Sequence, residues 1–293
     1  MRRFLKILFL LLFLLLIGAG FLFVSHGFLY RVPEQSSTRT LTVLTYNTHG
    51  MGQARKTPGN AVIKFLQQSD ADLLCLQEVD VYKNPEYLTL NELRNSLQGY
   101  PYTYFDFKVY NSRHQFGNVV FSKYPLVNKH TIRYPSRANI SSCCDVVVGQ
   151  DTLRLFTNHL ESYRFTGSEL DSVAAHPFHT DTVIRRKVQS ASRSRFRQAR
   201  IIADSVAASP YPVMLVGDLN SLPLSPTYLL LRLHLRDAFL QTSSVRLGST
   251  YRKGRIGLRI DYILHSPDLT PTDCHTIRTT GSDHLPLQAT FVW

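Results

Sequence analysis

Residues 212–220 (PVMLVGDLN) constrain the fold more than any other segment of this chain. An apolar run with the length of a β-strand stops at Gly217, and Asp218 and Asn220 follow it, two positions apart. Side chains alternate along a strand, so residues two positions apart point to the same side. We therefore expect Asp218 and Asn220 to be presented together at the end of a buried strand, where loops often carry the chemistry of a protein.

Five other apolar runs follow the same design, and each delivers a polar side chain. The residues delivered are Asn47, Glu78, Asn158 with His159, Asp261, and Asp283 with His284. None of the runs delivers a serine or cysteine nucleophile beside a plausible base. Carboxylate and carboxamide oxygens suit a hard cation, Mg²⁺ or Mn²⁺, and histidines can face negative charge on a phosphoryl group. Although one strand-terminal Asp is more often a turn or helix cap, the set indicates metal-assisted phosphoester hydrolysis.

At these residues the chain resembles the endonuclease/exonuclease/phosphatase superfamily, the deoxyribonuclease I-like group, as a membrane-anchored bacterial-type member. The resemblance covers about residues 40–293. It implies an α/β (α+β) fold in which two β-sheets form a sandwich flanked by helices, four layers in all, with the site at one end. The matching motifs are Thr45-Tyr46-Asn47, Leu76-Gln77-Glu78-Val79, 117–125 (GNVVFSKYP), Asn158-His159-Leu160, 217–221 (GDLNS), Arg259-Ile260-Asp261-Tyr262 and 282–286 (SDHLP).

The resemblance also implies a role for each matched residue. The catalytic set is His159, Asp218, Asn220, Asp261 and His284, the metal set is Asn47, Glu78 and Asp283, and Asn220 and His159 also hold substrate. In this set Asp218 activates the water and Asp261 orients His284. An ion pair of Asp261 with Arg259 or Arg255 is the alternative. The segment Thr48-His49-Gly50 departs from branches that carry a second acidic ligand, which leaves one or two metals open.

The rest of the chain is organised around one catalytic domain, residues 41–293. Apolar residues at three- and four-residue spacing predict helices over 61–68 and 182–208. Residues 164–182 read as an irregular loop. Cys75 lies in an apolar run and is expected to be a buried thiol, whereas a disulfide that uses Cys143, Cys144 or Cys274 stays open.

The N-terminus has a character of its own. Residues 7–24 are apolar without a charge, and Arg2, Arg3 and Lys6 precede them. This predicts a transmembrane helix within residues 1–30, followed by a tether over 31–40; a cleaved signal peptide is the alternative. The excess of positive charge before the apolar run predicts a single-pass protein of the cell membrane with its catalytic domain outside the cytoplasm, in the periplasm.

Charge gives a further indication of the partner. The chain has 33 Lys+Arg against 21 Asp+Glu, a net charge of +12, and such a surface attracts polyanions or anionic lipid head groups. Seven of the basic residues fall within 185–200 without an acidic neighbour. The solvated face of a helix is the favoured interpretation, and a phosphate-backbone or membrane-surface patch is the alternative.

Three functions are compatible with these features. The first is a Mg²⁺-dependent phosphodiesterase, a nuclease that acts on nucleic acid. The second is a hydrolase of phospholipid, sphingomyelin or inositol-phosphate head groups, because members of one superfamily share a site and differ in the loops around it. The third is a catalytically silent binding module, which the intact set of site residues disfavours. No obligate protein partner is inferred.

Overall fold

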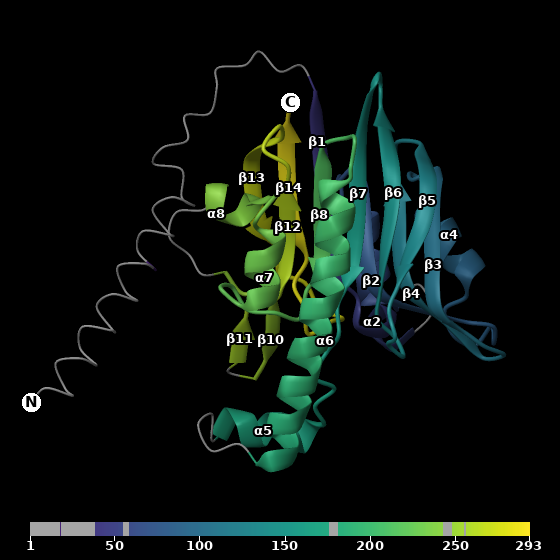
Figure 1. The fold of residues 1–293 in the computed structure, drawn as a ribbon. Helices are drawn as coiled ribbons and strands as arrows, with labels where there is room; N and C mark the ends of the chain where they lie inside the picture. Colours follow the sequence, from purple (N-terminus) through teal and green to yellow (C-terminus); the bar gives the residue numbers. More distant parts are fainter. Residues whose placement is uncertain (1–17, 19–38, 55–58, 176–180, 243–247, 255) are drawn as a thin grey trace, which may run out of the picture.

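The computed structural model describes residues 18, 39–54, 59–175, 181–242, 248–254 and 256–293 (Figure 1). The predicted membrane anchor, apart from Gly18, and most of the predicted tether lie outside these residues. Within the described ranges, no helix combines the length and apolar character that crossing a membrane requires.

Two six-stranded sheets form the centre of the fold (Figure 1). The first sheet has the order β13 (Thr270–Thr276), β14 (Leu287–Val292), β1 (Thr40–Asn47), β2 (Leu73–Tyr82), β4 (His114–Ser122) and β3 (Tyr102–Tyr110). The second has the order β5 (Leu126–Arg133), β6 (Ile140–Val148), β7 (Asp151–His159), β8 (Val213–Asp218), β12 (Asp261–His265) and β9 (Arg236–Asp237). Only β1–β2 and β7–β8 are parallel among these pairs of described strands, so both sheets are mixed.

The alternation of side chains along these strands decides what each face of a sheet packs against. In β8, Met214 and Val216 point into the core between the two sheets, and Leu215 points to the outer face. In β1, Val43 points into the same inner core and Leu44 to the outer face of the first sheet. Both faces of each sheet are therefore buried, which explains why these strands read as continuous apolar runs.

Helices cover the two outer faces. On the first sheet lie α3 (Ala61–Gln67) and α4 (Leu90–Ser96), and on the second lie α6 (Thr182–Ala207) and α7 (Pro226–Leu231). The remaining elements are α2 (His49–Ala54), α5 (Gly167–Ala175), α8 (Ala238–Thr242), β10 (Tyr251–Lys253) and β11 (Ile256–Leu258). The predicted sandwich with helices on both sides is confirmed, in four layers.

The two predicted helices form within a residue of their expected bounds, and side chains cap both. Asn60 accepts a hydrogen bond from the backbone N–H of Ile63 at the start of α3, and Asp181 caps α6. The prediction of a loop over 164–182 is wrong, because α5 lies within it. Thr166 and Glu169 form a capping box at its start, which is a helix signal in the sequence. All four cysteines are buried free thiols, so the disulfide is absent.

Candidate active site

The inner face of the second sheet ends in polar groups. Along β8 the inward positions run Met214, Val216 and Asp218, so the inner core passes into a carboxylate at the end of the strand. Gly217 permits this close packing, because its φ is +123° and a Cβ there would lie 2.1 Å from the carbonyl oxygen of Asn158. Only glycine fits this position.

Three neighbouring strands of this sheet place functional groups at the same level. Asp218 pairs in register with His159 on β7 and with Asp261 on β12. All three side chains are almost fully buried. The sequence run of each strand therefore determines a row of histidine, aspartate and aspartate across the end of the sheet.

The first sheet contributes Asn47 and Glu78 opposite this row. The amide nitrogen of Asn47 donates hydrogen bonds to Glu78 Oε1 (3.1 Å) and to Asp218 Oδ2 (3.0 Å), so this one side chain joins the two sheets. Glu78 lies where the register of β2 and β4 shifts, and its φ is +52°. This backbone conformation is uncommon for a non-glycine residue, and such strain concentrates at functional sites. His159 Nε2 lies 3.3 Å from Glu78 Oε1.

His284 stands against Asp261 as the sequence predicts. Its Nδ1 lies 2.9 Å from Asp261 Oδ2, and its Nε2 points toward Asp218 Oδ2 at 3.9 Å. The alternative partner Arg259 is engaged elsewhere, since it forms a buried ion pair with Asp237 at 2.5 Å. Arg255 lies outside the described residues.

Asn220 joins the site by a different route from the one its spacing suggests. The strand ends at Asp218, and Asn220 adopts a left-handed turn with φ +47°. Its backbone N–H donates to Asp218 Oδ1 (2.7 Å), and its amide nitrogen donates to Asp218 Oδ2 (3.1 Å) and to the Leu160 carbonyl (3.0 Å). The turn, not strand alternation, brings the two side chains together.

Asp283 lies at the rim of the site, with its side chain 27% exposed. Its Oδ1 is 3.3 Å from His49 Nδ1. Ser282 reaches inward instead and donates to the Asn47 carbonyl at 2.8 Å. In the sequence, His49 stood out only as a departure from a family pattern. In the structure it lies beside Asp283 and is close enough for its charge to act on Glu78.

Burial and neighbouring charges shift the pKa values of Asp218 and Glu78 in opposite directions. Burial raises the pKa of Asp218 and the charge of Asp261 raises it further, against His284 and His159, to about 6. Burial also acts to raise the pKa of Glu78, but His159 and a hydrogen bond from Asn47 outweigh it and the pKa falls. Glu78 is thus an anion at neutral pH, and Asp218 is poised near its titration point.

His284 is a cation at neutral pH. Burial lowers its pKa, but the charge and hydrogen bond of Asp261 and the charge of Asp218 raise it to about 10. Asp218, Asp261 and His284 place potential ligand atoms within 4.8 Å of one another. A protonated imidazole has no lone pair for a metal, so this group fits a charge-stabilising role better than a metal centre.

The oxygens around Glu78 fit a divalent cation better. The Glu78 side chain is an ionised carboxylate that is 26% exposed. Asp283 Oδ1 is buried and lacks a hydrogen-bond partner among the described residues. Carboxylate oxygens with Asn47 beside them form a hard donor set. A divalent metal is therefore compatible with Glu78 and Asn47, with Asp283 as a further candidate ligand.

Two residues that sequence reasoning missed hold the His159 segment in place. Arg195 Nη1 donates to the Glu161 carbonyl (2.7 Å), and the backbone N–H of Glu161 donates to Gln198 Oε1 (3.0 Å). Both come from α6 and are buried. Arg195 belongs to the basic stretch that was expected to be a solvated helix face, so that interpretation is wrong for this one arginine. A buried arginine cannot be told from an exposed one by spacing alone.

The chain belongs to the Endonuclease/Exonuclease/phosphatase family, which matches residues 44–284. Members of this family hydrolyse phosphoesters, and the chain is a phosphoesterase of this family. No curated protein is similar enough in sequence to count as a match.

Solved structures of the same fold include proteins of several kinds. An endonuclease/exonuclease/phosphatase from Beutenbergia cavernae is 22% identical, with a TM-score of 0.64 over 87% of this chain and 72% of its own. A humanized D. rerio TDP2 is 19% identical, with a TM-score of 0.63 over 87% and 99%. ANGEL2, a 2',3'-cyclic phosphatase, is 16% identical, with a TM-score of 0.56 over 86% and 95%. At these identities the likeness concerns the fold alone.

Proposed function

We propose that this chain is a Mg²⁺-dependent phosphodiesterase that cleaves nucleic acid by attack of a water that Asp218 deprotonates. The supporting observation is that polar side chains from the ends of both sheets contact one another. Asn47 bridges Glu78 on one side and Asp218 on the other, with His159 and His284 beside them. A base, two groups that can face phosphoryl oxygens and an anionic metal ligand thus lie within one small volume.

Each residue has a task that its surroundings suit. Asp218, with a pKa of about 6, is ionised at neutral pH and basic enough to take a proton from water. Asn220 keeps Asp218 oriented through two hydrogen bonds. Positively charged His284, held by Asp261, stabilises the charge that develops on phosphoryl oxygens. His159 Nε2 is buried 3.3 Å from Glu78 Oε1 but makes no hydrogen bond among the described residues, so it can donate one to a substrate oxygen.

Glu78, Asn47 and Asp283 would hold the Mg²⁺, which supplies Lewis-acid polarisation of the phosphate when it is bound. The low pKa of Glu78 keeps its carboxylate ionised for this purpose. The manganese ion has similar ligand preferences and would serve as a substitute.

Nucleic acid is favoured as the substrate by the arginines of α6. Arg186, Arg193 and Arg197 are exposed, and none has an ion-pair partner among the described residues. Unpaired cations beside a phosphodiesterase site attract a polyanion. A lipid-head-group hydrolase is the second candidate, because the exposed leucines Leu222 (49%) and Leu224 (55%) follow the site directly and would suit a membrane surface.

The test is a substrate panel with residues 37–293. Plasmid DNA, RNA, sphingomyelin vesicles, phosphatidylinositol phosphates and bis-p-nitrophenyl phosphate are each incubated with Mg²⁺ or with EDTA. We expect Mg²⁺-dependent cleavage of DNA or RNA, inhibited by salt. Cleavage of the vesicles alone would select the lipid hydrolase. Binding without turnover of any phosphodiester would select the silent module.

The apolar N-terminal run supports a further proposal, that the protein is anchored in the cell membrane with its catalytic domain in the periplasm. An alkaline-phosphatase reporter fused after Trp293 should then be active. An inactive reporter would reverse the orientation, and recovery of a shortened soluble protein would show that the run is a cleaved signal.

A further inference from the structure

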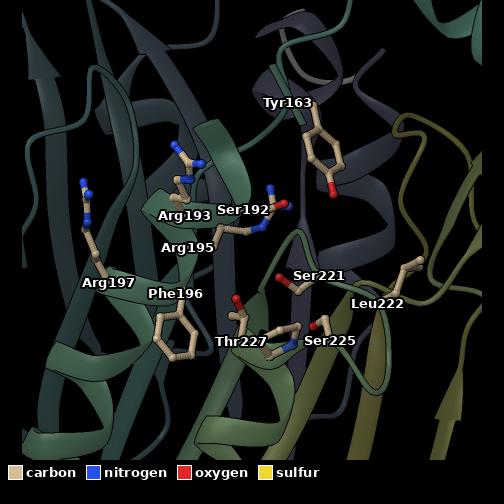
Figure 2. A pocket seen from close by; sticks show the side chains of 11 residues that line it. Tyr163, Ser192, Arg193, Arg195, Phe196, Arg197, Ser221, Leu222, Ser225 and Thr227 are labelled. Carbon is tan, nitrogen blue, oxygen red and sulfur yellow. The ribbon is translucent and has the colours of Figure 1, made fainter. Parts of the chain in front are cut away.

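A cavity of about 470 Å³ lies between α6, α7 and the segment that follows β8 (Figure 2). This volume is within the range of small-molecule sites. Two of its lining residues lie close in the chain to residues of the proposed active site. Ser221, on its wall, follows Asn220 directly, and Tyr163 lies four residues beyond His159. Whatever part of a substrate extends from the reacting phosphate in this direction therefore enters the cavity.

One face of the cavity is available for stacking. Tyr163 is already engaged, since its ring stacks with Phe165 at a centroid distance of 5.1 Å and the Arg195 guanidinium lies 4.3 Å from its centroid. Phe196 is different, because its side chain is 39% exposed and its ring has no aromatic or cationic partner within the described parts of the chain. Phe196 and Thr227 both line the cavity, and Figure 2 shows their side chains.

The polar groups of the cavity suit an anion with hydrogen-bonding edges. Three arginines line it and no acidic residue does. Arg193 and Arg197 are exposed. Arg195 is 2% exposed, and its Nε is buried without a hydrogen-bond partner among the residues that the structure places. Asp218 and this guanidinium interact electrostatically, which places the buried cation near the reacting centre.

Hydroxyl groups decide between a nucleotide and an acyl chain. Ser192, Ser221, Ser225 and Thr227 all line the cavity. An acyl chain offers no polar group to these hydroxyls and cations, and it would leave the buried Nε of Arg195 without a hydrogen-bond partner. A nucleoside offers both the flat apolar face and the polar edges that such a wall needs.

We propose that this cavity is a subsite for the nucleoside next to the scissile phosphate, with its base stacked on Phe196 and its outer phosphate held by Arg193 and Arg197. The inference rests on the proposed phosphodiesterase function and specifies that the cavity binds a nucleoside of the substrate. Stacking of a base on an aromatic ring tolerates every base, so the subsite selects for a nucleotide without selecting a sequence.

Binding and turnover are measured separately to test this. The dinucleotide pTpT is titrated into the protein in EDTA by calorimetry, with the Phe196→Ala and Arg197→Gln variants. Two exposed residues of the same helix outside the cavity provide matched controls, Ile201→Ala and Arg200→Gln. We expect Phe196→Ala to weaken binding about tenfold, the scale of one lost stack, and Ile201→Ala to leave it unchanged.

For turnover, thymidine 5'-(p-nitrophenyl phosphate) is compared with methyl p-nitrophenyl phosphate, which lacks the nucleoside. Phe196→Ala should lower kcat/KM about tenfold for the first ester and not for the second. Equal binding of pTpT by all variants would overturn the subsite even if both esters are hydrolysed. Loss of pTpT binding in Phe196→Ala without hydrolysis of any phosphodiester by the wild type would support the subsite and overturn the proposed function. A Phe196→Ala defect confined to sphingomyelin vesicles would assign the cavity to lipid and overturn the inference.

Discussion

Replacement of Asp261 by asparagine tests the central electrostatic pair of the site. In the folded protein the carboxylate of Asp261 lies 2.9 Å from His284 Nδ1. The Asp261→Asn substitution keeps the shape of the side chain and removes its charge. Burial acts to lower the pKa of His284, and the charge of Asp261 is the main effect that opposes it. Without that charge, we expect the pKa of His284 to fall below its ordinary value of 6.5.

The size of the effect follows from the pKa. A rise from 6.5 to about 10 corresponds to about 5 kcal/mol of favourable interaction with the proton. This stability is fully present below pH 6.5 and is lost as pH rises through 10, because the folded state then gives up its proton. Asp261→Asn also relieves the repulsion that raises the pKa of Asp218. We therefore expect a net loss of about 3 kcal/mol at pH 7, the lower end of the range for a broken buried pair.

Histidine NMR and urea denaturation, both in EDTA, measure the two quantities. The His284 resonance should titrate near 10 in the wild type and below 6.5 in Asp261→Asn, and the stability difference should shrink between pH 7 and pH 10. Asp273→Asn is the matched control, because Asp273 also pairs with a histidine, His275, but both side chains are about half exposed. Its cost should be under about 1 kcal/mol.

A His284 pKa that stays near 10 in Asp261→Asn would refute the assignment of Asp261 as its source of charge. Turnover adds an independent check. Because the pair acts as a unit, Asp261→Asn with His284→Ala should be little worse than His284→Ala alone on one phosphodiester substrate. If the two defects multiply, the pairing has no catalytic role.

Three other outcomes are expected. Glu78→Gln should lower turnover at least a hundredfold and leave Tm nearly unchanged, and EDTA should abolish activity; full activity in EDTA would contradict the metal role. Asp237→Asn should cost about 3–5 kcal/mol in urea denaturation, because Arg259 is then buried without its partner; an unchanged midpoint would contradict this. Burial lowers the pKa of His265 to about 4, so stability should fall by about 3 kcal/mol as pH drops from 6.5 to 4, where the unfolded chain binds the additional proton; His265→Gln should remove that dependence.

The strands and their polar ends were predictable because local alternation encodes them. The inner positions of β8 lead from Met214 to Asp218 whatever the rest of the chain does. The positions of Asn220 and Asp283 were less predictable, because each depends on a turn whose dihedral angles the residue types leave open. Helix α5 has a readable cap at Thr166, which apolar periodicity alone does not detect.

Arg195 marks the limit of sequence reasoning at this site. Helical periodicity describes an arginine within a basic run as solvated. Its burial is accompanied by a hydrogen bond to the Glu161 carbonyl, which lies in the segment after β7, 34 positions away. This contact depends on the tertiary structure, so no local sequence pattern predicts it. The cysteine pairing was open for the same reason.

The pairing of β1 with β14 has a consequence for biosynthesis. Thr42 and Thr290 contact each other across this pair, 248 positions apart. While the ribosome is still translating the intervening residues, one edge of β1 has no neighbour, and His284 has not yet been added. Asn47 and Glu78 emerge early but can meet His284 only after the residues between them have been synthesised. With the roles proposed above, a chain that has not yet received His284 would be inactive, and its unpaired β1 edge would be open to proteolysis.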